Sequence, residues 1–430
     1  MENRKLIKSA TVLSMDARIG NQHNYDVLIE GDKIVEVARS ISESGAELID
    51  GSGMIAMPGF IDAHHHMWMG VLRNLGADFL ISKQVLDGKQ QAALAANFRP
   101  EDVYASTLSS AINAIESGIT TVLDHANLPG AEQLAANAKA LTESGLRSVL
   151  AAPASLGEAG LQALQASLPA GRITLALASS DPQDVSTQQL QEEWALARKL
   201  GLRISAQVGM GTSPTQDQLA ELNKAKLLGA DILFAHGNTL TDRDLSAIKS
   251  AGSSVVMTPA AEMMQGFGAP TVQRFLDAGF GPALGVDTEI ANRGDMFTQM
   301  RSANSMQHAM RFDKKLAGNL FADRMLTTRD VIQFVSAYGA EALGMQASIG
   351  TLAPGKQADV ILLRQNHINV MPVNDPIGAV AWAMDNSNID SVLVGGTFLK
   401  REGKLLNHPL SQMQAQVNQA RQHVLGSVPA

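Results

Sequence analysis

The chain has 430 residues, 45% hydrophobic and 18% charged, enough for a large barrel with an accessory domain. It contains no cysteine, which excludes disulfides and thiolate metal ligands, so any metal must be bound by imidazole, carboxylate, amide or water. The net charge of −8 argues against nucleic acid and anionic membranes as partners, and no apolar run approaches the roughly 18 residues of a membrane span. We therefore expect a cytoplasmic protein.

Both ends of the chain are rich in short predicted strands. Residues 27–34 contain a strand, a Gly-Asp turn and a second strand. Near the other end, residues 358–363 form a predicted strand and residues 391–399 a predicted hairpin. This pattern indicates a small β-sandwich built from both chain ends.

The middle of the chain repeats one unit, in which a short apolar run is followed by a polar turn and a helical pattern. With the strand before His64, eight such strands are predicted, the other seven at residues 120–123, 148–152, 174–177, 203–208, 232–235, 254–257 and 283–286. Strands that alternate with helices indicate a parallel, distorted (β/α)8 TIM barrel. A doubly wound open sheet is the main alternative, but the sequence has no dinucleotide-binding or phosphate-loop motif after a strand.

These patterns divide the chain into three parts. The predicted parts are a β-sandwich domain (1–56 and 356–405), a catalytic barrel (57–355) and a C-terminal helix (406–430).

The first barrel strand ends in a cluster of histidines. Residues 54–61 form an apolar run, and His64, His65 and His66 follow it closely. On an extended strand His64 and His66 point to the same face, because side chains alternate with a period of two. Two imidazoles on one face at a strand end can bind one metal ion.

Chemistry in such barrels takes place at the carboxyl ends of the strands, so the polar residues at those ends are candidates for the site. In strand order, these residues are His64 and His66, Asp124 and His125, Gln207, His236, Thr258 and Asp287.

The sequence motifs around these strand ends resemble those of the amidohydrolase superfamily, in its cytosine deaminase-like and chlorohydrolase-like branch. The resemblance covers nearly the whole chain and rests on residues 58–66, 118–124, 235–238, 284–288 and 349–360. It implies a barrel enzyme that uses one divalent metal ion. Zinc is the first expectation, with iron, manganese or cobalt as alternatives.

The resemblance also implies roles for individual residues. His64 and His66 match the family's metal-binding pair, and Asp287 matches the ligand on the eighth strand. The bound metal lowers the pKa of a water molecule and so supplies the nucleophile. His236 matches the histidine that orients this water or the developing oxyanion, and Asp287 can also take the proton from the water.

Two positions depart from the family pattern. Gln207 stands where a fifth-strand histidine ligand is expected, and Met210 stands where a glutamate usually shuttles protons. An amide oxygen can bind a metal but is a weaker, uncharged ligand, and methionine cannot transfer a proton. Either Gln207 or His125 completes the metal shell in this interpretation, and His125 is also a candidate acid or base. Occupancy of the metal site is therefore an open question.

The loops near the site predict a flat, weakly polar ligand. Trp68 lies in an apolar segment at residues 67–80, and Phe267 follows the seventh strand. We expect Trp68, Met210, Glu262 and Phe267 to bind substrate, and Glu262 and Glu289 are possible replacement acids.

The predicted function is hydrolysis of a C–N bond in a small cyclic or aromatic compound, by deamination or by amide or carbamate cleavage. His236, Asp287 and His125 are the predicted catalytic residues, and the habit of the family suggests a homodimer or larger homo-oligomer. Because of the two departures, an alternative is an acid/base enzyme on the same scaffold that uses little or no metal. It would catalyse cyclisation, hydration or elimination on a small aromatic or heterocyclic metabolite. An inactive paralogue is a further alternative.

Overall fold

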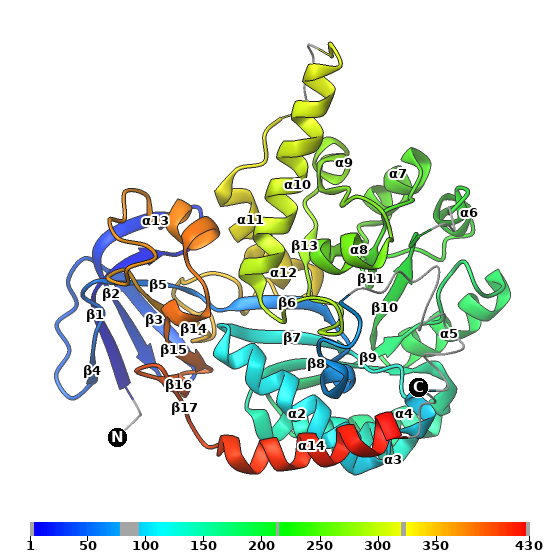
Figure 1. The fold of residues 1–430 in the computed structure, drawn as a ribbon, viewed down its shortest axis with the longest axis horizontal. Helices are drawn as coiled ribbons and strands as arrows, with labels where there is room; N and C mark the ends of the chain where they lie inside the picture. Colours follow the sequence, from blue (N-terminus) through cyan, green and yellow to red (C-terminus); the bar gives the residue numbers. More distant parts are fainter. Residues whose placement is uncertain (1–3, 78–93, 212–214, 320–323, 427–430) are drawn as a thin grey trace.

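Eight parallel strands form a barrel in the computed structural model, which describes residues 4–77, 94–211, 215–319 and 324–426 (Figure 1). In spatial order the strands are β6 (Phe60–His65), β7 (Ile119–His125), β8 (Arg147–Pro153), β9 (Ile173–Ala178), β10 (Arg203–Val208), β11 (Ile232–His236), β12 (Ser254–Met257) and β13 (Ala283–Leu284). A parallel bridge between His65 and Asp287 connects the first strand to the segment after the last. The predicted barrel is therefore confirmed.

Helices follow the barrel strands and cover the outside of the barrel (Figure 1). They are α2 (Pro100–Glu116), α3 (Ala131–Ser144), α4 (Gly157–Ser167), α5 (Thr187–Lys199), α6 (Gln218–Lys224), α7 (Asp242–Ala251), α8 (Pro259–Gln265), α9 (Val272–Asp277), α10 (Met296–Leu316), α11 (Thr328–Phe334) and α12 (Ala337–Ala342). Several begin at a residue whose side chain accepts a hydrogen bond from the first turn, such as Ser186, Thr241 and Asp295. In the part of the chain that the structure describes, no helix has the length and apolarity needed to cross a membrane.

A second, mixed sheet combines both ends of the chain, as the sequence predicts (Figure 1). Its strands are β1 (Arg4–Leu13), β2 (Asn21–Glu30), β3 (Lys33–Ala38), β4 (Glu47–Asp50), β5 (Met54–Pro58), β14 (Val360–Arg364), β15 (Ile389–Val394), β16 (Thr397–Arg401) and β17 (Lys404–Leu405). The two halves join where β14 pairs antiparallel with β5. The short α13 (Pro376–Gly378) precedes β15, and α14 (Leu410–Gly426) lies along α2. The exact domain boundaries stay a prediction.

The apolar run at residues 54–61 differs from the single strand that the sequence suggests. It is split at Gly59, so that β5 belongs to the second sheet and β6 to the barrel. A Cβ atom at Gly59 would lie 2.1 Å from the side chain of Thr120, which leaves room only for glycine at this crossing. One continuous segment therefore ties the two sheets together just before the histidine cluster.

Small side chains fill the inside of the barrel. Alanines from several strands, including Ala63, Ala151 and Ala235, pack there with Ile61 and Leu233. Residues of α12 and the following turn join the same cluster, at the end where the strands begin. The opposite, carboxyl end is left to the polar side chains of the site.

Candidate metal centre and active-site cavity

Two histidines and an aspartate face one another where the barrel closes. The Nε2 atoms of His64 and His66 each lie 3.6 Å from Oδ1 of Asp287, and all three side chains are buried. Ligand atoms about 2.0–2.1 Å from a tetrahedral zinc ion stand roughly 3.3 Å apart, so this spacing fits one ion between them. Ligand atoms of His64, His236 and Asp287 also lie within 4.8 Å of one another.

The hydrogen bonds leave the two histidines ready to bind a metal. Neither ring nitrogen of His64 has a hydrogen-bond partner among the described residues, although the ring is fully buried. Nδ1 of His66 contacts the backbone oxygen of His125 at 2.8 Å, which orients the ring and turns Nε2 toward Asp287. A buried imidazole without partners is costly in an empty site, so the donor set fits a divalent ion.

The electrostatics favour neutral rings at these positions. Burial and the neighbouring His66 hold the pKa of His64 well below its ordinary value. Burial lowers the pKa of His66 to about 4, although the nearby carboxylate of Asp287 acts in the opposite direction. Metal ligation requires the neutral imidazole, so these shifts prepare both residues for a cation at neutral pH.

The backbone at the site is strained at two places. His236 and Asp287 have φ angles of 74° and 68°, in the left-handed region that residues other than glycine seldom occupy. Asp287 is held in this conformation by both of its backbone groups, because its N–H donates to the oxygen of His64 and its oxygen accepts from the N–H of His66. Strained backbone conformations of this kind are common at functional sites, where contacts with the surrounding structure hold them in place.

Asp62 stabilises the contact between the first barrel strand and the segment that leads to Asp287. Its Oδ1 accepts hydrogen bonds from the N–H groups of Val286 and His64, and its Oδ2 lies 2.8 Å from Nδ1 of His65. The carboxylate therefore binds the ring of His65 and the backbone of His64.

His236 is held by a buried carboxylate on the neighbouring loop. Its Nδ1 lies 3.4 Å from Oε1 of Glu262 and 3.2 Å from Oγ1 of Thr258. Burial lowers the pKa of His236, but the hydrogen bond to Glu262 and the charge of Asp287 more than offset this, so the pKa lies above its ordinary value. His236 thus combines a fixed orientation with a tendency to carry a proton.

Gln207 reaches the centre, but its nearest partner is another side chain. Its Oε1 lies 3.3 Å from Nε2 of His236, and the residue also lines the adjoining cavity. Met210 follows β10 in a loop and is only partly buried. Whether Gln207 binds metal and Met210 binds substrate stays a prediction.

His125 connects the metal centre to a large cavity. Its ring centroid lies 5.3 Å from that of His64 and 5.2 Å from that of His66. Its Nδ1 contacts Oγ of Ser205 at 3.0 Å, and burial together with the neighbouring His64 holds its pKa well below the ordinary value. The residue also lines a cavity of about 930 Å³ that extends over the ends of β7 to β10.

The remaining predicted substrate residues lie close to the centre but are buried. Trp68 belongs to the short helix η1 (Met67–Leu72), and its Nε1 donates to Asn127, which lines the cavity. The ring of Phe267 stands edge-on to His236 at 5.1 Å between centroids. Glu262 also accepts hydrogen bonds from the N–H of Thr258 and from Asn238. Their roles in substrate binding stay predictions, and residues 78–80 of the predicted apolar segment lie outside the described residues.

The sequence reasoning missed two residues at the site. Gln265, at the end of α8, donates from Nε2 to Oδ2 of Asp287 at 3.0 Å. Asp181 follows β9 and lines the same cavity as His125 and Gln207. The strand-end rule could have identified Asp181, because it lies three residues after β9 ends. The sequence carries no comparable signal for Gln265.

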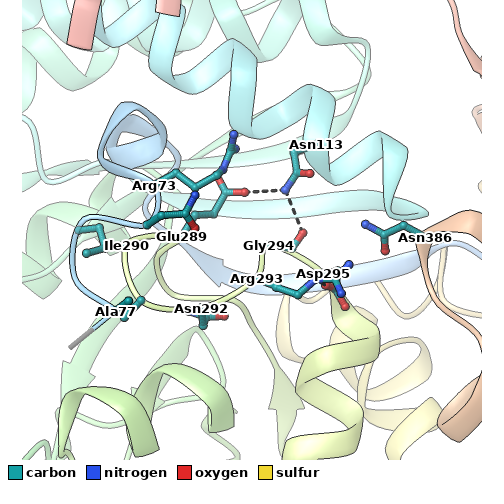
Figure 2. Close-up of a pocket in the computed structure, with 12 residues that line it drawn as sticks. Arg73, Ala77, Asn113, Glu289, Ile290, Asn292, Arg293, Gly294, Asp295 and Asn386 are labelled. Carbon is teal, nitrogen blue, oxygen red and sulfur yellow. Dashed lines mark hydrogen bonds and ion pairs between the residues drawn. The ribbon is translucent and has the colours of Figure 1, made fainter. Parts of the chain in front are cut away.

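Glu289 anchors the loop that carries Asp287 through hydrogen bonds. Its carboxylate accepts hydrogen bonds from Arg73, Ser110 and Asn113, at 2.7, 2.6 and 2.5 Å. Figure 2 shows Asn113 reaching from α2 to both Glu289 and Gly294 beside a cavity of about 390 Å³. Three hydrogen bonds on a buried carboxylate indicate a structural anchor and argue against the replacement acid suggested by the sequence.

Comparison with known proteins identifies the family of the chain and two of its relatives. The model of the Amidohydrolase family matches residues 55–399. A 5-methylthioadenosine/S-adenosylhomocysteine deaminase of Pelotomaculum thermopropionicum is 28% identical over 94% of both chains. A 5'-deoxyadenosine deaminase of Methanothermobacter thermautotrophicus is 26% identical over 94% of this chain and 95% of its own.

Solved structures show the same fold. An adenosine deaminase from Xanthomonas campestris with bound zinc superposes with a TM-score of 0.86 at 20% identity, over 98% of both chains. The zinc complex of an atrazine chlorohydrolase from Arthrobacter aurescens has a TM-score of 0.83 at 20% identity, over 97% of this chain and 99% of its own.

Proposed function

The chain belongs to the amidohydrolase family, and we propose that it removes the exocyclic amino group of an aminopurine nucleoside with the help of zinc. The enzyme is a metal-dependent hydrolase of non-peptide C–N bonds in small cyclic compounds. The observation that carries the proposal is the buried His64, whose two unpartnered ring nitrogens adjoin His66 and Asp287. The nucleoside class is supported by the two deaminase relatives.

In this proposal each residue has a distinct task. His64, His66 and Asp287 would hold the ion, whose contribution would be to lower the pKa of a water molecule so that a nucleophile is available at neutral pH. Asp287 accepts the proton of the attacking water, and Gln265 keeps the second oxygen of Asp287 in place. His236, oriented by Glu262, stabilises negative charge as it develops. His125 faces the substrate from the cavity side.

The test is deamination of adenosine, 5'-deoxyadenosine and 5'-methylthioadenosine, followed as released ammonia. We expect activity that disappears on chelation and returns with zinc. His64→Asn should lose both the metal and the activity, whereas His367→Asn, a change of the same kind outside the barrel, should retain both. Metal content of the purified protein is measured in parallel by elemental analysis.

Two outcomes would change the proposal. A metal content below about a tenth of an equivalent, unchanged after incubation with zinc, iron or manganese, would show that the proposed mechanism does not use a bound metal. Activity that survives chelation but is lost in His125→Ala would favour the acid/base alternative that Gln207 and Met210 suggest.

A further inference from the structure

The cavity beside the metal centre is lined by several acidic side chains. The described residues that line it come from the ends of β7, β8, β9 and β10 and from α5, and they include Asp181, Asp184 and Glu193. No lysine or arginine is among these lining residues. A ligand in this cavity therefore meets carboxylates on one side and no lysine or arginine among the described lining residues.

The three carboxylates differ in their partners. Glu193 is buried and accepts hydrogen bonds from Ser180 and Gln189, so its charge is balanced by donors. Asp181 and Asp184 have no ion-pair partner within the described parts of the chain. Burial and the neighbouring Asp184 raise the pKa of Asp181 to about 7. A cation placed between these two carboxylates would relieve their repulsion.

A second feature of the cavity also points to a ligand. His125 is 2% exposed, and while its Nδ1 contacts Ser205, no hydrogen bond reaches its Nε2 from the described residues. The same ring adjoins His64 and His66 at the metal centre. A molecule bound at the metal would therefore contact His125 and extend toward Asp181.

The size of the cavity leaves space beyond a reacting ring. Its volume of about 930 Å³ lies near the upper end of the range of about 300–1,000 Å³ that is common for small-molecule sites. The acidic side chains do not form a group that could hold a metal, since the cluster found among the described residues is that of His64, His236 and Asp287. An organic cation fits this wall better than a second metal ion.

We propose that the substrate carries a protonated amine on the side away from the scissile bond, and that Asp181 and Asp184 bind this group. Analogues with an anionic group in the same place are rejected, because the wall offers them like charge and its described residues include no lysine or arginine. This inference rests on the proposed function for the identity of the reacting ring, and adds the chemistry of the distal group.

The first experiment compares three adenosine derivatives that differ only in the 5' substituent, which is an amino group, a hydrogen or a carboxylate. For the zinc-loaded enzyme we expect kcat/KM to fall in that order, by at least about tenfold from the amine to the carboxylate. Asp181→Asn and Asp184→Asn should each reduce the ratio of amine to carboxylate severalfold. The matched control is Glu192→Gln, an exposed acid on α5 beside Glu193 that does not line the cavity.

A second experiment separates this inference from the deamination itself. Calorimetry measures the binding of 1,4-diaminobutane and of succinate to the zinc-loaded protein and to the same variants. Tighter binding of the diamine that depends on Asp181 supports the acidic subsite even if no nucleoside is deaminated, and then the proposed function alone fails. Equal binding of the two probes, or a preference unchanged in both Asp→Asn variants, would overturn the subsite whatever the nucleoside result.

Discussion

At the scale of single residues, the chemistry of the site depends on which groups lack partners. Oxygens of Asp62, Glu262 and Glu289 each accept several hydrogen bonds. His64 has none at either ring nitrogen among the described residues. Buried polar atoms are nearly always satisfied in folded proteins, so a fully buried imidazole without partners indicates where a cation belongs.

The departure at Gln207 can be tested by restoring the family residue. Gln207→His should tighten zinc binding by at least about tenfold, because imidazole is a better ligand than an amide oxygen. Chelator competition measures the affinity. Gln189→His, on another wall of the cavity, is the control and should leave the affinity unchanged. Weaker binding by Gln207→His would mean that position 207 lies outside the metal shell.

The raised pKa of Asp124 predicts how the stability of the fold depends on pH. Burial raises the pKa of this carboxyl to about 6, whereas an unfolded aspartate has a value near 3.8. The folded state therefore binds the proton of Asp124 more tightly than the unfolded state does. Because this proton is lost at higher pH, the free energy of unfolding falls as the pH rises from about 4 to about 6.

Asp124→Asn removes this dependence. Between about pH 4.5 and about pH 6.5, the free energy of unfolding of the wild type should fall by about 2 kcal/mol relative to the variant. Urea denaturation of both metal-free proteins across this range provides the measurement. Parallel pH profiles would show that Asp124 titrates normally in the folded protein.

At the scale of elements, the site depends on how β6 meets β13. The two strands approach so closely that a Cβ atom at Gly285 would lie 2.7 Å from the backbone oxygen of His64 and 2.8 Å from its nitrogen. Backbone atoms in a closed barrel cannot move aside as a flexible side chain can. Gly285 therefore sets the distance between the His64 pair and Asp287.

Gly285→Ala should consequently weaken both the fold and the metal centre. We expect a loss of about 1–3 kcal/mol in the free energy of unfolding, the usual cost of overpacking, and at least about tenfold weaker zinc binding. Gly426→Ala is the control, because no atom lies within 4 Å of the added methyl group. Unchanged zinc affinity in Gly285→Ala would show that the junction is more adaptable than the structure indicates.

At the scale of the whole molecule, a buried ion pair joins the barrel to the second sheet. Nε and Nη2 of Arg147, on β8, donate to the two oxygens of Asp359, next to β14, at 2.7 and 3.1 Å. Asp359 also accepts a hydrogen bond from the N–H of Gly395. Both charged side chains are less than a tenth exposed. Removing one partner leaves the other charge buried and unpaired, which is far more costly than losing an exposed pair.

Asp359→Asn should therefore lower the free energy of unfolding by about 3 kcal/mol, as measured by chemical denaturation. The control is Glu158→Gln, which breaks the exposed pair with Lys199 and should cost less than about 1 kcal/mol. Similar losses in the two variants would argue that the junction between the sheets does not depend on this pair.

The sequence by itself determined the architecture and supplied the candidate members of the centre. Strand runs that alternate with helical patterns identified the barrel, and the residues at their ends identified His64, His66, His125, His236 and Asp287 as candidates. These signals are local, because burial and alternation along one strand show in the residues of that strand. The general reaction, metal-dependent C–N hydrolysis, was implied by the resemblance of the motifs at residues 58–66, 118–124, 235–238, 284–288 and 349–360 to the amidohydrolase superfamily, and membership of that family confirms it.

Only the tertiary structure decided which side chains act on one another. The break of the first strand at Gly59, the contact of Glu262 with His236 and the hydrogen bond from Gln265 to Asp287 all join residues whose pairing has no periodic signal. The acidic wall around Asp181 likewise forms only when neighbouring strand ends come together. Such contacts depend on the closure of the barrel, which brings distant segments within a few ångströms, and no pattern along the chain records those distances.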